Sequence, residues 1–576
     1  MSEGATAEKS RREAVEGGTA APAGGWRSPA SIGLLVACAC SGILLLIFQS
    51  RFGFVWDEWD FLVYRRGVSA ATFLDPHNDH IALAPVAIYK ILLEAFGMDS
   101  AMPFQVVSTF LFLLSAVLLF AYMRRRVGDW AALLGTSLLL FLGAGWPDLL
   151  WAFQIGFSGS IAAGLGALLA LDRNDRLGDR VACVLLVVAT SFSELGVPFV
   201  AGAIVSIAIG GRDWRRRAYV GIVPLALYGL WWLGWGHAAE RTYSLENAVT
   251  SPGYVFDAVS QAIASLLGLA TPLTGSGSEP VGLNWGRILL VAGIALLAWR
   301  ARRRGGIPRG FWIVAAVGFT FWFLAAFNES PFRAATSGRY QYPGAVFVLL
   351  IAAELLRGVS IGRRALAVAG AITVAAVASG IVFLHQGYKV LKGNSVAERA
   401  QLAALEIARQ TVDPGYVLHF DPLGLWSVNA SSYFSATDAF GSPAFSESEL
   451  ASAPAGAQLN ADRALVSALR VKMTAGKGAA LPSAGEGRRP CRILRAAPIA
   501  PPPVDLRPGE VTIQRRAGPG VEVLLGRFSD GFSFDLGSLQ SARAGSFALP
   551  ADRSTRPWRL GVRGSGLVSV CEAGLA

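Results

Sequence analysis

The feature that most constrains this chain is a series of apolar segments, most of them long enough to cross a lipid bilayer. A membrane-spanning helix needs about 20 predominantly apolar residues, with about 17 to 25 tolerated. Eleven segments stand out, two of them short, at residues 31–50, 103–123, 129–147, 152–171, 181–193, 196–211, 218–236, 284–299, 310–327, 343–357 and 365–384. We therefore predict an α-helical polytopic membrane protein with about eleven spans over residues 31–384.

Composition supports this class. The chain is 53% hydrophobic and only 16% charged, whereas a soluble domain has about 25% charged residues. These values exclude a disordered chain, a small disulfide-dense secreted protein and a typical cytosolic enzyme. Residues 1–30 are rich in Gly, Ala, Glu and Arg and are predicted to be a disordered cytoplasmic tail. No signal-peptide cleavage site accompanies the first span, so we expect it to be retained.

Clusters of arginine predict the orientation, because cytoplasmic loops retain positive charge. The clusters are Arg124 to Arg126, Arg212 with Arg215 to Arg217, Arg300 with Arg302 to Arg304, and Arg357 with Arg363 and Arg364. All can be cytoplasmic only if residues 237–283 stay outside, so the polar-interrupted apolar stretch 254–273 is predicted to be a re-entrant or interfacial helix. The net charge of +11 is then topological. We expect a multi-pass plasma-membrane protein and no nucleic-acid partner, since no soluble segment interleaves Lys with aromatic residues.

From about residue 385 the chain becomes too polar to span a membrane, and residues 385–576 are predicted to form an extracytoplasmic α+β domain. Residues 396–410 have a helical pattern. Short alternating runs at 511–514, 521–525, 531–536, 560–562 and 567–571 predict a β-sandwich-like or jelly-roll-like module from about residue 504. Cys491 and Cys571 are the two cysteines of this domain. On the oxidising side of the membrane they form either a disulfide or two buried thiols.

The first outer loop, residues 51–102, contains an acidic cluster directly after the first span. Asp57, Glu58 and Asp60 lie within four residues of one another. Carboxylates concentrated at a membrane surface need a compensating cation, proton or partner. They suit either oxygen ligation of a divalent metal or general-base activation of a hydroxyl group. The alternative is that these acids are simply permitted by topology, beside tryptophans that anchor the loop at the interface.

A second cluster in the same loop is His77, Asn78, Asp79 and His80, which holds two of the five histidines in the chain. A His-x-x-His spacing in a loop is compatible with a metal site but has low specificity without further ligands. The alternative is that they cap and hydrogen-bond the start of the helix predicted over 81–96. That helix is amphipathic and is expected to lie along the interface.

Further polar residues occur in other outer loops. Glu194 lies in a tight turn between two short spans, and Arg333, Arg339 and Tyr340 lie between the spans 310–327 and 343–357. Arginine in an outer loop opposes the orientation rule, and a phosphate at the membrane face would account for it, because guanidinium binds phosphate oxygens in bidentate fashion. An ion pair with Glu329 or a lipid headgroup is the alternative.

These features resemble the GT-C superfamily of integral-membrane glycosyltransferases. The Asp57–Glu58 pair resembles the first-loop motif of protein O-mannosyltransferases and of the lipid A aminoarabinose transferase. The stretch from His77 to His80 is similar to an Asn-Glu-His-type segment of uncharacterised bacterial relatives. The likeness covers the architecture of residues 1–384 but specific residues in these two short motifs only, and the Trp-Trp-Asp motif of oligosaccharyltransferases is absent.

The resemblance implies transfer of a sugar from a polyprenyl-phosphate donor to a glycan, lipid or protein acceptor of the cell envelope. In such an inverting displacement Asp57 would be the general base, with Glu58 or Asp60 assisting or holding a metal. Asp79, His80 and Glu194 would be ligands of a divalent metal such as Mg or Mn. Arg339 and Arg333, with Tyr340, would bind the donor phosphate; His77 and Asn78 complete the second cluster.

Two other classes of function remain open. A transporter or flippase for a polyprenyl-linked glycan would place ionisable residues near the membrane midplane and show internal repeats. The predicted spans hold few charges, the acids gather at one face, and no repeat is evident, which favours the enzyme. The third class is a non-catalytic envelope scaffold whose C-terminal domain binds glycan.

Overall fold

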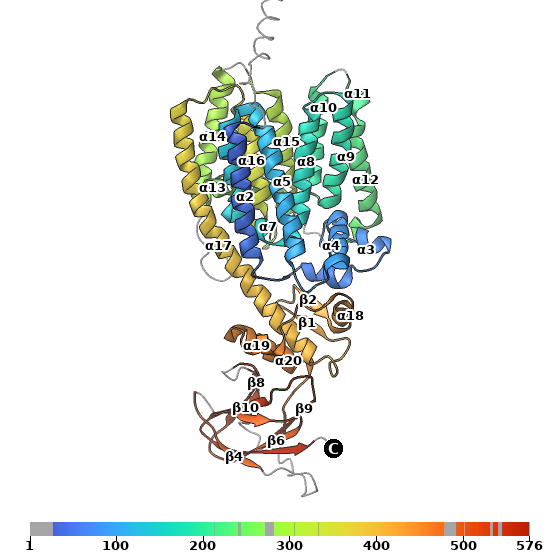
Figure 1. Cartoon of the computed structure of the whole chain (residues 1–576), viewed down its shortest axis with the longest axis vertical. Helices are drawn as coiled ribbons and strands as arrows, with labels where there is room; N and C mark the ends of the chain where they lie inside the picture. The colour runs from blue at the N-terminus through green and yellow to red at the C-terminus, as the bar shows by residue number, and fades with distance from the viewer. Residues whose placement is uncertain are drawn as a thin grey trace, which may run out of the picture. The chain divides into compact units, whose positions relative to one another are not determined.

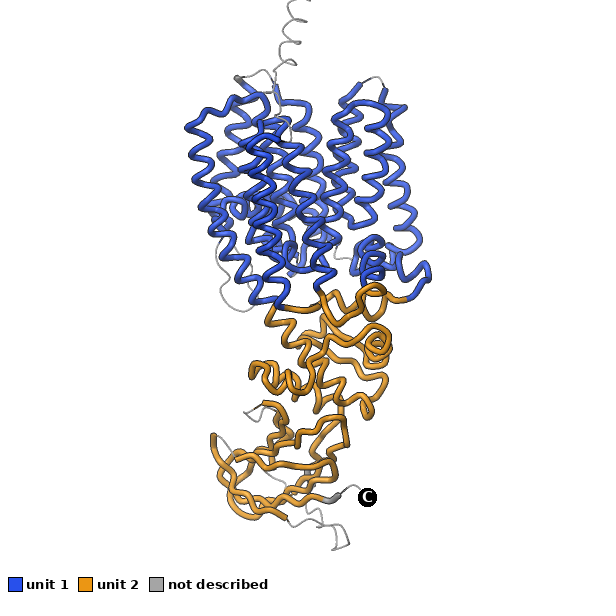
Figure 2. The backbone as a smooth tube through the Cα atoms, viewed as in Figure 1, with its two compact units in different colours: residues 1–51, 67–92, 102–391 blue, residues 52–66, 93–101, 392–576 orange. Residues whose placement is uncertain are grey.

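The computed structural model describes residues 27–211, 213–239, 243–270, 282–303, 306–331, 333–476, 491–499, 502–529, 534–539 and 544–574. Most of the predicted disordered tail lies outside these residues, as do Arg212 and Arg304 of the arginine clusters. The chain divides into two compact units (Figure 2). Unit 1 comprises residues 1–51, 67–92 and 102–391, and unit 2 comprises residues 52–66, 93–101 and 392–576.

Unit 1 is a helical bundle (Figure 1). Its long helices are α2 (Pro29–Gln49), α5 (Met102–Val127), α6 (Asp129–Leu140), α8 (Ile155–Leu171), α9 (Arg176–Phe192), α10 (Gly196–Ile209), α12 (Tyr219–Gly234), α13 (Leu245–Leu266), α14 (Leu283–Arg303), α15 (Arg309–Phe327), α16 (Gln341–Leu355) and the first part of α17 (Arg363–Ile407). Shorter helices are α3 (Ala70–Leu74), α7 (Trp146–Leu150) and α11 (Trp214–Arg217), and α4 (Leu83–Phe96) begins in this unit. Each of the predicted apolar segments is helical, which confirms the helical class of this part of the chain.

Length and hydropathy select fewer spans than the sequence predicts. Among the described residues, six helices are long and apolar enough to cross a membrane. The count becomes seven if α6 and the following segment 143–150, bent by 44° relative to it, form one span. Helices α9, α10, α12 and α16 match predicted spans but have only 17, 14, 16 and 15 residues, fewer than the about 20 of a standard span. Eleven spans therefore stay a prediction.

Arginines of the clusters contact acidic residues and, in one case, a residue of another cluster. The contacts are Arg126 with Asp172 and Glu354, Arg217 with Asp179 and Asn174, and Arg300 with the carbonyl of Arg357. Glu354 is fully buried, so its charge is compensated by Arg126 and by the hydroxyl of Tyr122, which donates to it at 2.8 Å. The residues predicted to share the cytoplasmic face therefore lie together in the fold.

The stretch predicted to be re-entrant or interfacial forms α13, which packs against α14, α15 and α16. Asp257 on α13 is paired with Arg287 on α14, 2.8 Å from its Nε. Helix α13 is not among the described helices that meet the length and hydropathy criteria for a span. Its interfacial position stays a prediction.

Unit 2 joins a small α+β part to two antiparallel sheets. The first part contains the end of α17, the strands β1 (Val417–His419) and β2 (Ser427–Asn429), and the helices α18 (Ala430–Phe440), α19 (Glu447–Ala451) and α20 (Ala455–Ala468). The sheets have the strand orders β5-β10-β7-β8 and β3-β9-β6-β11-β4. Their strands are β3 (Thr474–Gly476), β4 (Arg492–Arg495), β5 (Val504–Leu506), β6 (Gly509–Ala517), β7 (Val521–Gly526), β8 (Phe534–Ser538), β9 (Ala544–Leu549), β10 (Trp558–Gly564) and β11 (Leu567–Gly574).

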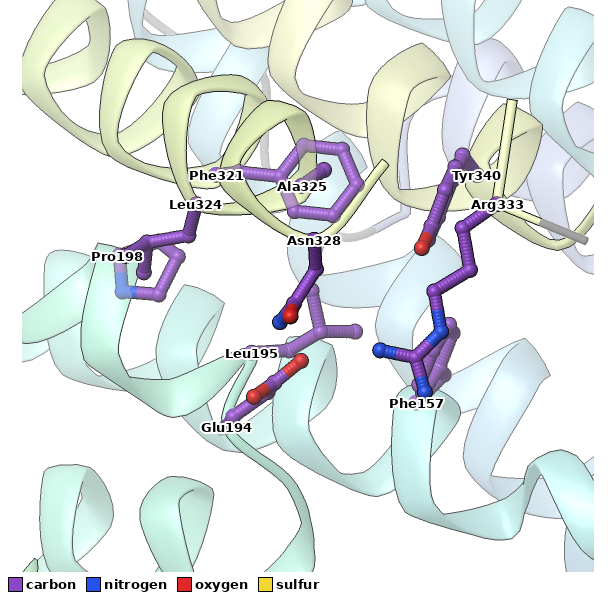
Figure 3. A pocket seen from close by; sticks show the side chains of 10 residues that line it. All are labelled: Phe157, Glu194, Leu195, Pro198, Phe321, Leu324, Ala325, Asn328, Arg333 and Tyr340. Carbon is purple, nitrogen blue, oxygen red and sulfur yellow. The ribbon is translucent and has the colours of Figure 1, made fainter. Parts of the chain in front are cut away.

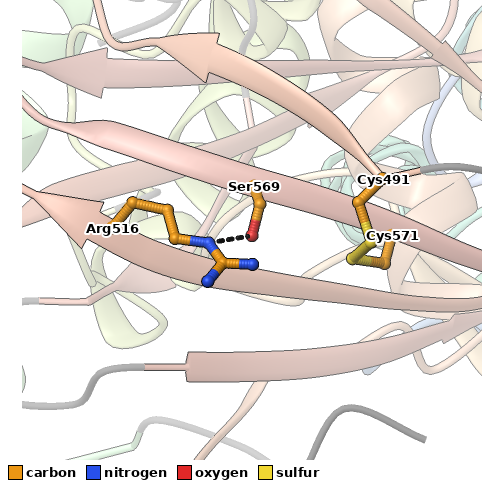
Figure 4. The surroundings of a disulfide bond; sticks show 4 residues. All are labelled: Cys491, Arg516, Ser569 and Cys571. Carbon is orange, nitrogen blue, oxygen red and sulfur yellow. Dashed lines mark hydrogen bonds between the residues drawn. A yellow bond between two sulfur atoms is a disulfide. The ribbon is translucent and has the colours of Figure 1, made fainter. Parts of the chain in front are cut away.

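The β-rich end of the chain is as predicted, and the described parts of the predicted runs correspond to β6, β7, β8, β10 and β11; residues 531–533 of the third run lie outside the described residues. Alternation of apolar and polar residues produces this result, since every second side chain of a strand faces the core. Trp558 and Leu560 of β10 and Ile513 of β6 are fully buried. Cys491 and Cys571 form a disulfide that ties the residue before β4 to β11, close to the hydrogen bond from Arg516 Nε to Ser569 Oγ (3.0 Å, Figure 4).

Candidate functional sites in the two units

Unit 1 contains a pocket between the start of α10 and the end of α15. Its lining is apolar except for four side chains: Phe157, Leu195, Pro198, Phe321, Leu324 and Ala325 form the apolar part, and Glu194, Asn328, Arg333 and Tyr340 the polar part. In Figure 3 the Glu194 carboxylate and the Asn328 amide point toward one another, and Arg333 and Tyr340 lie on another side of the pocket. A mostly apolar pocket with a few convergent polar groups is typical of ligand sites.

Asp79 and Arg333 form a bidentate ion pair beside this pocket. Arg333 Nη2 lies 2.8 Å from Oδ1 of Asp79, and Nη1 lies 2.5 Å from Oδ2. Asn328 Nδ2 donates to the same Oδ2 at 3.2 Å. The Asp79 side chain is only 1% exposed. Burial raises the pKa of Asp79, but His80 and Arg333 outweigh it, so that the pKa falls below its ordinary value and the group is ionised.

His80 extends this pair into a chain of four charged groups. Its Nε2 lies 3.1 Å from Oδ1 of Asp79, and its Nδ1 lies 3.1 Å from Oε1 of Glu194. Burial lowers the pKa of His80, whereas Glu194 and then Asp79 raise it, and the pKa ends above its ordinary value. The four side chains contact one another in the order Glu194, His80, Asp79 and Arg333. Their charges alternate in sign when His80 is protonated.

The turn that carries His80 has a specific backbone shape. His77 and His80 exchange two backbone hydrogen bonds of 3.0 Å each, and Asn78 between them has a φ of 54°. Asparagine is one of the few residues that adopt this left-handed conformation readily. The His77 ring packs against Phe153 with 4.9 Å between ring centres. His77 and Asn78 therefore shape the turn.

This arrangement favours an ion-pair chain over the predicted metal centre. Asp79, His80 and Glu194 are indeed together, but both ring nitrogens of His80 face carboxylates, and Asp79 holds Arg333. A histidine ligand needs a ring nitrogen directed at the metal. Among the described residues, no group of three His, Cys, Asp or Glu side chains has an arrangement that could hold a metal ion. The metal stays an untested prediction, and no chemistry below depends on it.

The two arginines predicted to bind phosphate differ in their surroundings. Arg333 forms an ion pair with Asp79. The alternative to phosphate binding was an ion pair with Glu329, so the kind of interaction was predicted but the partner is different. Arg339 lies with its guanidinium 5.8 Å from the centre of the Tyr340 ring. Burial raises the pKa of Tyr340, with Arg339 and Arg333 acting in the opposite direction, so its hydroxyl stays a hydrogen-bond donor.

The acidic cluster of the first outer loop lies in unit 2, within a tight turn. Trp56 has a φ of 58°, which is rare for a bulky residue. Glu58 is 2% exposed, and its Oε2 accepts the backbone N–H of Val55 at 2.9 Å. Asp60 is paired with Arg65 at 2.8 Å. Two of the three acids thus have local structural partners.

Asp57, like Asp60 and unlike the buried Glu58, is half-buried, and it directly follows Trp56 in the turn. Its Oδ1 accepts a hydrogen bond of 3.2 Å from the indole Nε1 of Trp426. The rings of Trp426 and Trp56 are stacked, with 5.4 Å between their centres and 24° between their planes. The turn therefore places a carboxylate beside a pair of indoles.

Two residues that take part in these clusters were missing from the predictions: Glu398 and Trp426. Glu398 accepts hydrogen bonds from the Trp56–Trp59 turn although it lies 342 and 339 residues from its two partners. Glu398 could have been noticed as a charged residue within the helical pattern of residues 396–410. Nothing in the sequence marked Trp426, one of 16 tryptophans.

The apolar helices and the β-rich unit define a helical membrane protein with a C-terminal α+β part. No family model matches the chain, and no curated protein matches it. Among solved structures, the chain is similar to the crystal structure of ArnT from Cupriavidus metallidurans bound to undecaprenyl phosphate, with a TM-score of 0.42, 14% identity and coverage of 71% of this chain and 85% of that one. A similarity of this size establishes no shared family and no activity.

Proposed function

We propose that this chain is a membrane glycosyltransferase that transfers a sugar from a polyprenyl-phosphate donor to an extracytoplasmic acceptor, with Asp57 as the general base. The observation that supports this most is the turn at Trp56. A left-handed bulky residue costs on the order of 1–3 kcal/mol and persists where surrounding contacts hold it, often at functional sites. Here the next residue is the half-buried carboxylate Asp57.

The contacts within the turn select Asp57 from the three predicted acids. Glu58 accepts the Val55 amide and is buried, and Asp60 pairs with Arg65. Asp57 is half-buried and directly follows the left-handed residue Trp56, and its Oδ1 accepts the indole N–H of Trp426. It is therefore the acid best placed to take a proton from an incoming hydroxyl group.

The reaction balances as a single displacement. The acceptor hydroxyl gives its proton to Asp57 while its oxygen attacks the anomeric carbon of the donor sugar. The bond from that carbon to the phosphate oxygen breaks, and the polyprenyl phosphate leaves with the electron pair. Attack from the face opposite the leaving group inverts the anomeric configuration. The indole pair of Trp56 and Trp426 offers an apolar face and a polar N–H, a combination suited to a sugar ring.

For the donor phosphate we assign Arg339 ahead of Arg333. A guanidinium binds phosphate oxygens in bidentate fashion, but both terminal nitrogens of Arg333 already face Asp79. Tyr340, next to Arg339, supplies a hydroxyl donor at the same loop. Arg333 then acts as the structural partner that keeps Asp79 ionised.

The test uses the full chain in lipid nanodiscs with polyprenyl-phosphate sugars together with the envelope lipids and glycans of the expression host, which supply the acceptor hydroxyl groups that the reaction needs. Release of polyprenyl phosphate is followed by thin-layer chromatography in wild type, Asp57→Asn and the control Glu94→Gln, which removes an exposed carboxylate of the same outer loop. We expect Asp57→Asn to lose at least 100-fold in rate, within the range of general-base contributions of about 10²–10⁴. Wild-type rates in Asp57→Asn would refute the base assignment.

One observation favours the transporter alternative. Helices α6 and α7 are separated by a bend, and Asp148 on α7 is 1% exposed. Broken helices with buried ionisable groups are typical of substrate sites in transporters. If transport is the function, Asp148→Asn will abolish movement of a lipid-linked glycan across proteoliposomes, and no polyprenyl phosphate will be released by wild type.

A further inference from the structure

Glu398 is a buried carboxylate in the part of α17 that belongs to unit 2. It lies beyond the predicted span 365–384, and the residue is 2% exposed. Carboxylates of this burial are rare unless hydrogen-bonded or paired. None of the predicted roles includes it.

Two N–H groups of the turn that presents Asp57 donate hydrogen bonds to Glu398. The indole Nε1 of Trp59 donates to its Oε2 at 2.6 Å. The backbone N–H of Trp56 donates to the same carboxylate, 3.4 Å from Oε1 and 3.3 Å from Oε2. The two donors flank Asp57 in sequence, one on each side.

The Trp56 contact has a direct consequence for Asp57. Trp56 is the residue with left-handed backbone, and its amide is held by Glu398. Its ring stacks on Trp426, whose indole N–H donates to Asp57. The geometry thus links Glu398 to Asp57 through the Trp56 backbone and the indole pair.

The charged groups around Glu398 are mostly acidic. Glu58 lies on the same turn, and Asp421 accepts the backbone N–H groups of Leu423 and Trp426 at 2.8 and 2.9 Å. Arg399, the next residue of α17, is directed to the carbonyl of Pro443 instead. Burial raises the pKa of Glu398 to about 8; the two hydrogen bonds from the turn lower it, and Glu58 and Asp421 raise it. Glu398 is thus largely protonated at neutral pH.

We propose that Glu398 is a positioning residue that fixes the orientation of Asp57 by holding the Trp56–Trp59 turn. This proposal rests on the proposed function, in which Asp57 is the base. Protonated Glu398 accepts both turn donors without a buried charge. Ionisation strengthens the two hydrogen bonds from the turn, but burial and repulsion by Glu58 and Asp421 disfavour the negative charge by more, as the raised pKa indicates. The turn therefore loosens when Glu398 ionises.

The experiment compares Glu398→Gln, Glu398→Ala and the control Glu406→Gln, another carboxylate of α17. The Gln variant keeps an acceptor oxygen but cannot ionise, and the Ala variant removes the acceptor. Two readouts are measured on the full chain in nanodiscs: kcat and KM from pH 6 to 10, and hydrogen–deuterium exchange of the peptide covering residues 52–60, corrected for intrinsic exchange. The exchange measurement does not depend on activity.

We expect wild-type kcat to fall as pH rises through about 8, with exchange of 52–60 increasing over the same range. Glu398→Gln should keep the neutral-pH kcat within threefold and lose this alkaline decline. Glu398→Ala should lower kcat about tenfold or more while KM for the donor stays within threefold of wild type. The peptide 52–60 of this variant should exchange faster than that of wild type at every pH. Glu406→Gln should behave as wild type.

Distinct outcomes overturn distinct claims. Unchanged exchange of 52–60 and unchanged kcat in Glu398→Ala would refute the positioning role. An alkaline decline that persists in Glu398→Gln would refute the role of ionisation at this residue. If Asp57→Asn is fully active, the proposed function fails, while the exchange data still decide whether Glu398 holds the turn. If Glu398→Ala does not fold, the pH dependence of hydrogen–deuterium exchange of 52–60 in wild type and in Glu398→Gln tests the positioning role instead. The same pH dependence in both proteins would refute it.

Discussion

Breaking the Asp79–Arg333 pair should measurably destabilise unit 1. The variants are Asp79→Asn, Arg333→Met and the double variant. Arg333 makes two charge-assisted contacts with Asp79, of 2.8 and 2.5 Å, and the Asp79 side chain is 1% exposed whereas that of Arg333 is 18% exposed.

The magnitude follows from this burial. Removing one partner of a buried ion pair costs about 3–5 kcal/mol, because the other charge is left buried. Arg333→Met leaves Asp79 with Asn328 and His80 as remaining partners, which places the cost near the lower limit, at about 3 kcal/mol. Asp79→Asn leaves the partly exposed Arg333, which water reaches, so we expect about 2 kcal/mol. The double variant removes both charges and should cost less than the sum of the two, with a coupling energy of about 1.5–3 kcal/mol.

The assay is equilibrium unfolding of the purified chain in mixed micelles with increasing SDS, read by the fraction of helical ellipticity that remains. A coupling energy below about 0.5 kcal/mol in the double-mutant cycle would show that the two side chains do not act as a pair. An Arg333→Met variant as stable as wild type would refute the burial argument itself.

The remaining predictions concern the other parts of the chain. Glu194 and Asp79 raise the pKa of His80. The stability that this pairing contributes is therefore fully present below the ordinary histidine pKa of about 6.5 and is lost as pH rises through the folded-state pKa. His80→Gln should flatten this pH dependence of stability in SDS unfolding measured from pH 5 to 9. Arg339→Gln should raise KM for the lipid-linked donor about tenfold with a smaller change in kcat, and an unchanged KM would remove Arg339 from the phosphate site. Replacing Cys491 and Cys571 by Ser should destabilise the β-rich part of unit 2 by about 2–5 kcal/mol, visible as earlier proteolysis of that part alone.

The sequence was informative wherever the determinant is local. Apolar runs of helical length form helices, and alternating runs such as 511–514 and 567–571 form strands, because burial of one face depends on the residue pattern itself. Arginine clusters predicted which helix ends lie together. Within the predicted spans, the bend between α6 and α7 was missed, although Gly143, Gly145 and Pro147 mark the place where it occurs.

The sites depend on contacts between residues that are far apart in the sequence, which a single sequence does not reveal. Asp79 and Arg333 are 254 residues apart, and Trp59 and Glu398 are 339 residues apart. The sequence places Asp57 and Glu58 side by side with no indication that one is turned into the fold and the other is presented by the turn. That distinction arises from the backbone at Trp56, which has a conformation that residue type alone does not predict.

The central claim is that Asp57 is the base of a sugar-transfer reaction. The most direct measurement is the rate of polyprenyl-phosphate release from polyprenyl-phosphate sugars, in the presence of the host's envelope lipids and glycans as acceptors, by wild type, Asp57→Asn and Glu94→Gln in nanodiscs. We predict release by wild type and Glu94→Gln at equal rates, and at least a 100-fold lower rate with Asp57→Asn. Hydrogen–deuterium exchange of residues 52–60 in Asp57→Asn should match that of wild type, which shows that the turn is intact in the variant. Release by Asp57→Asn at the wild-type rate, or no release by wild type, would contradict the claim.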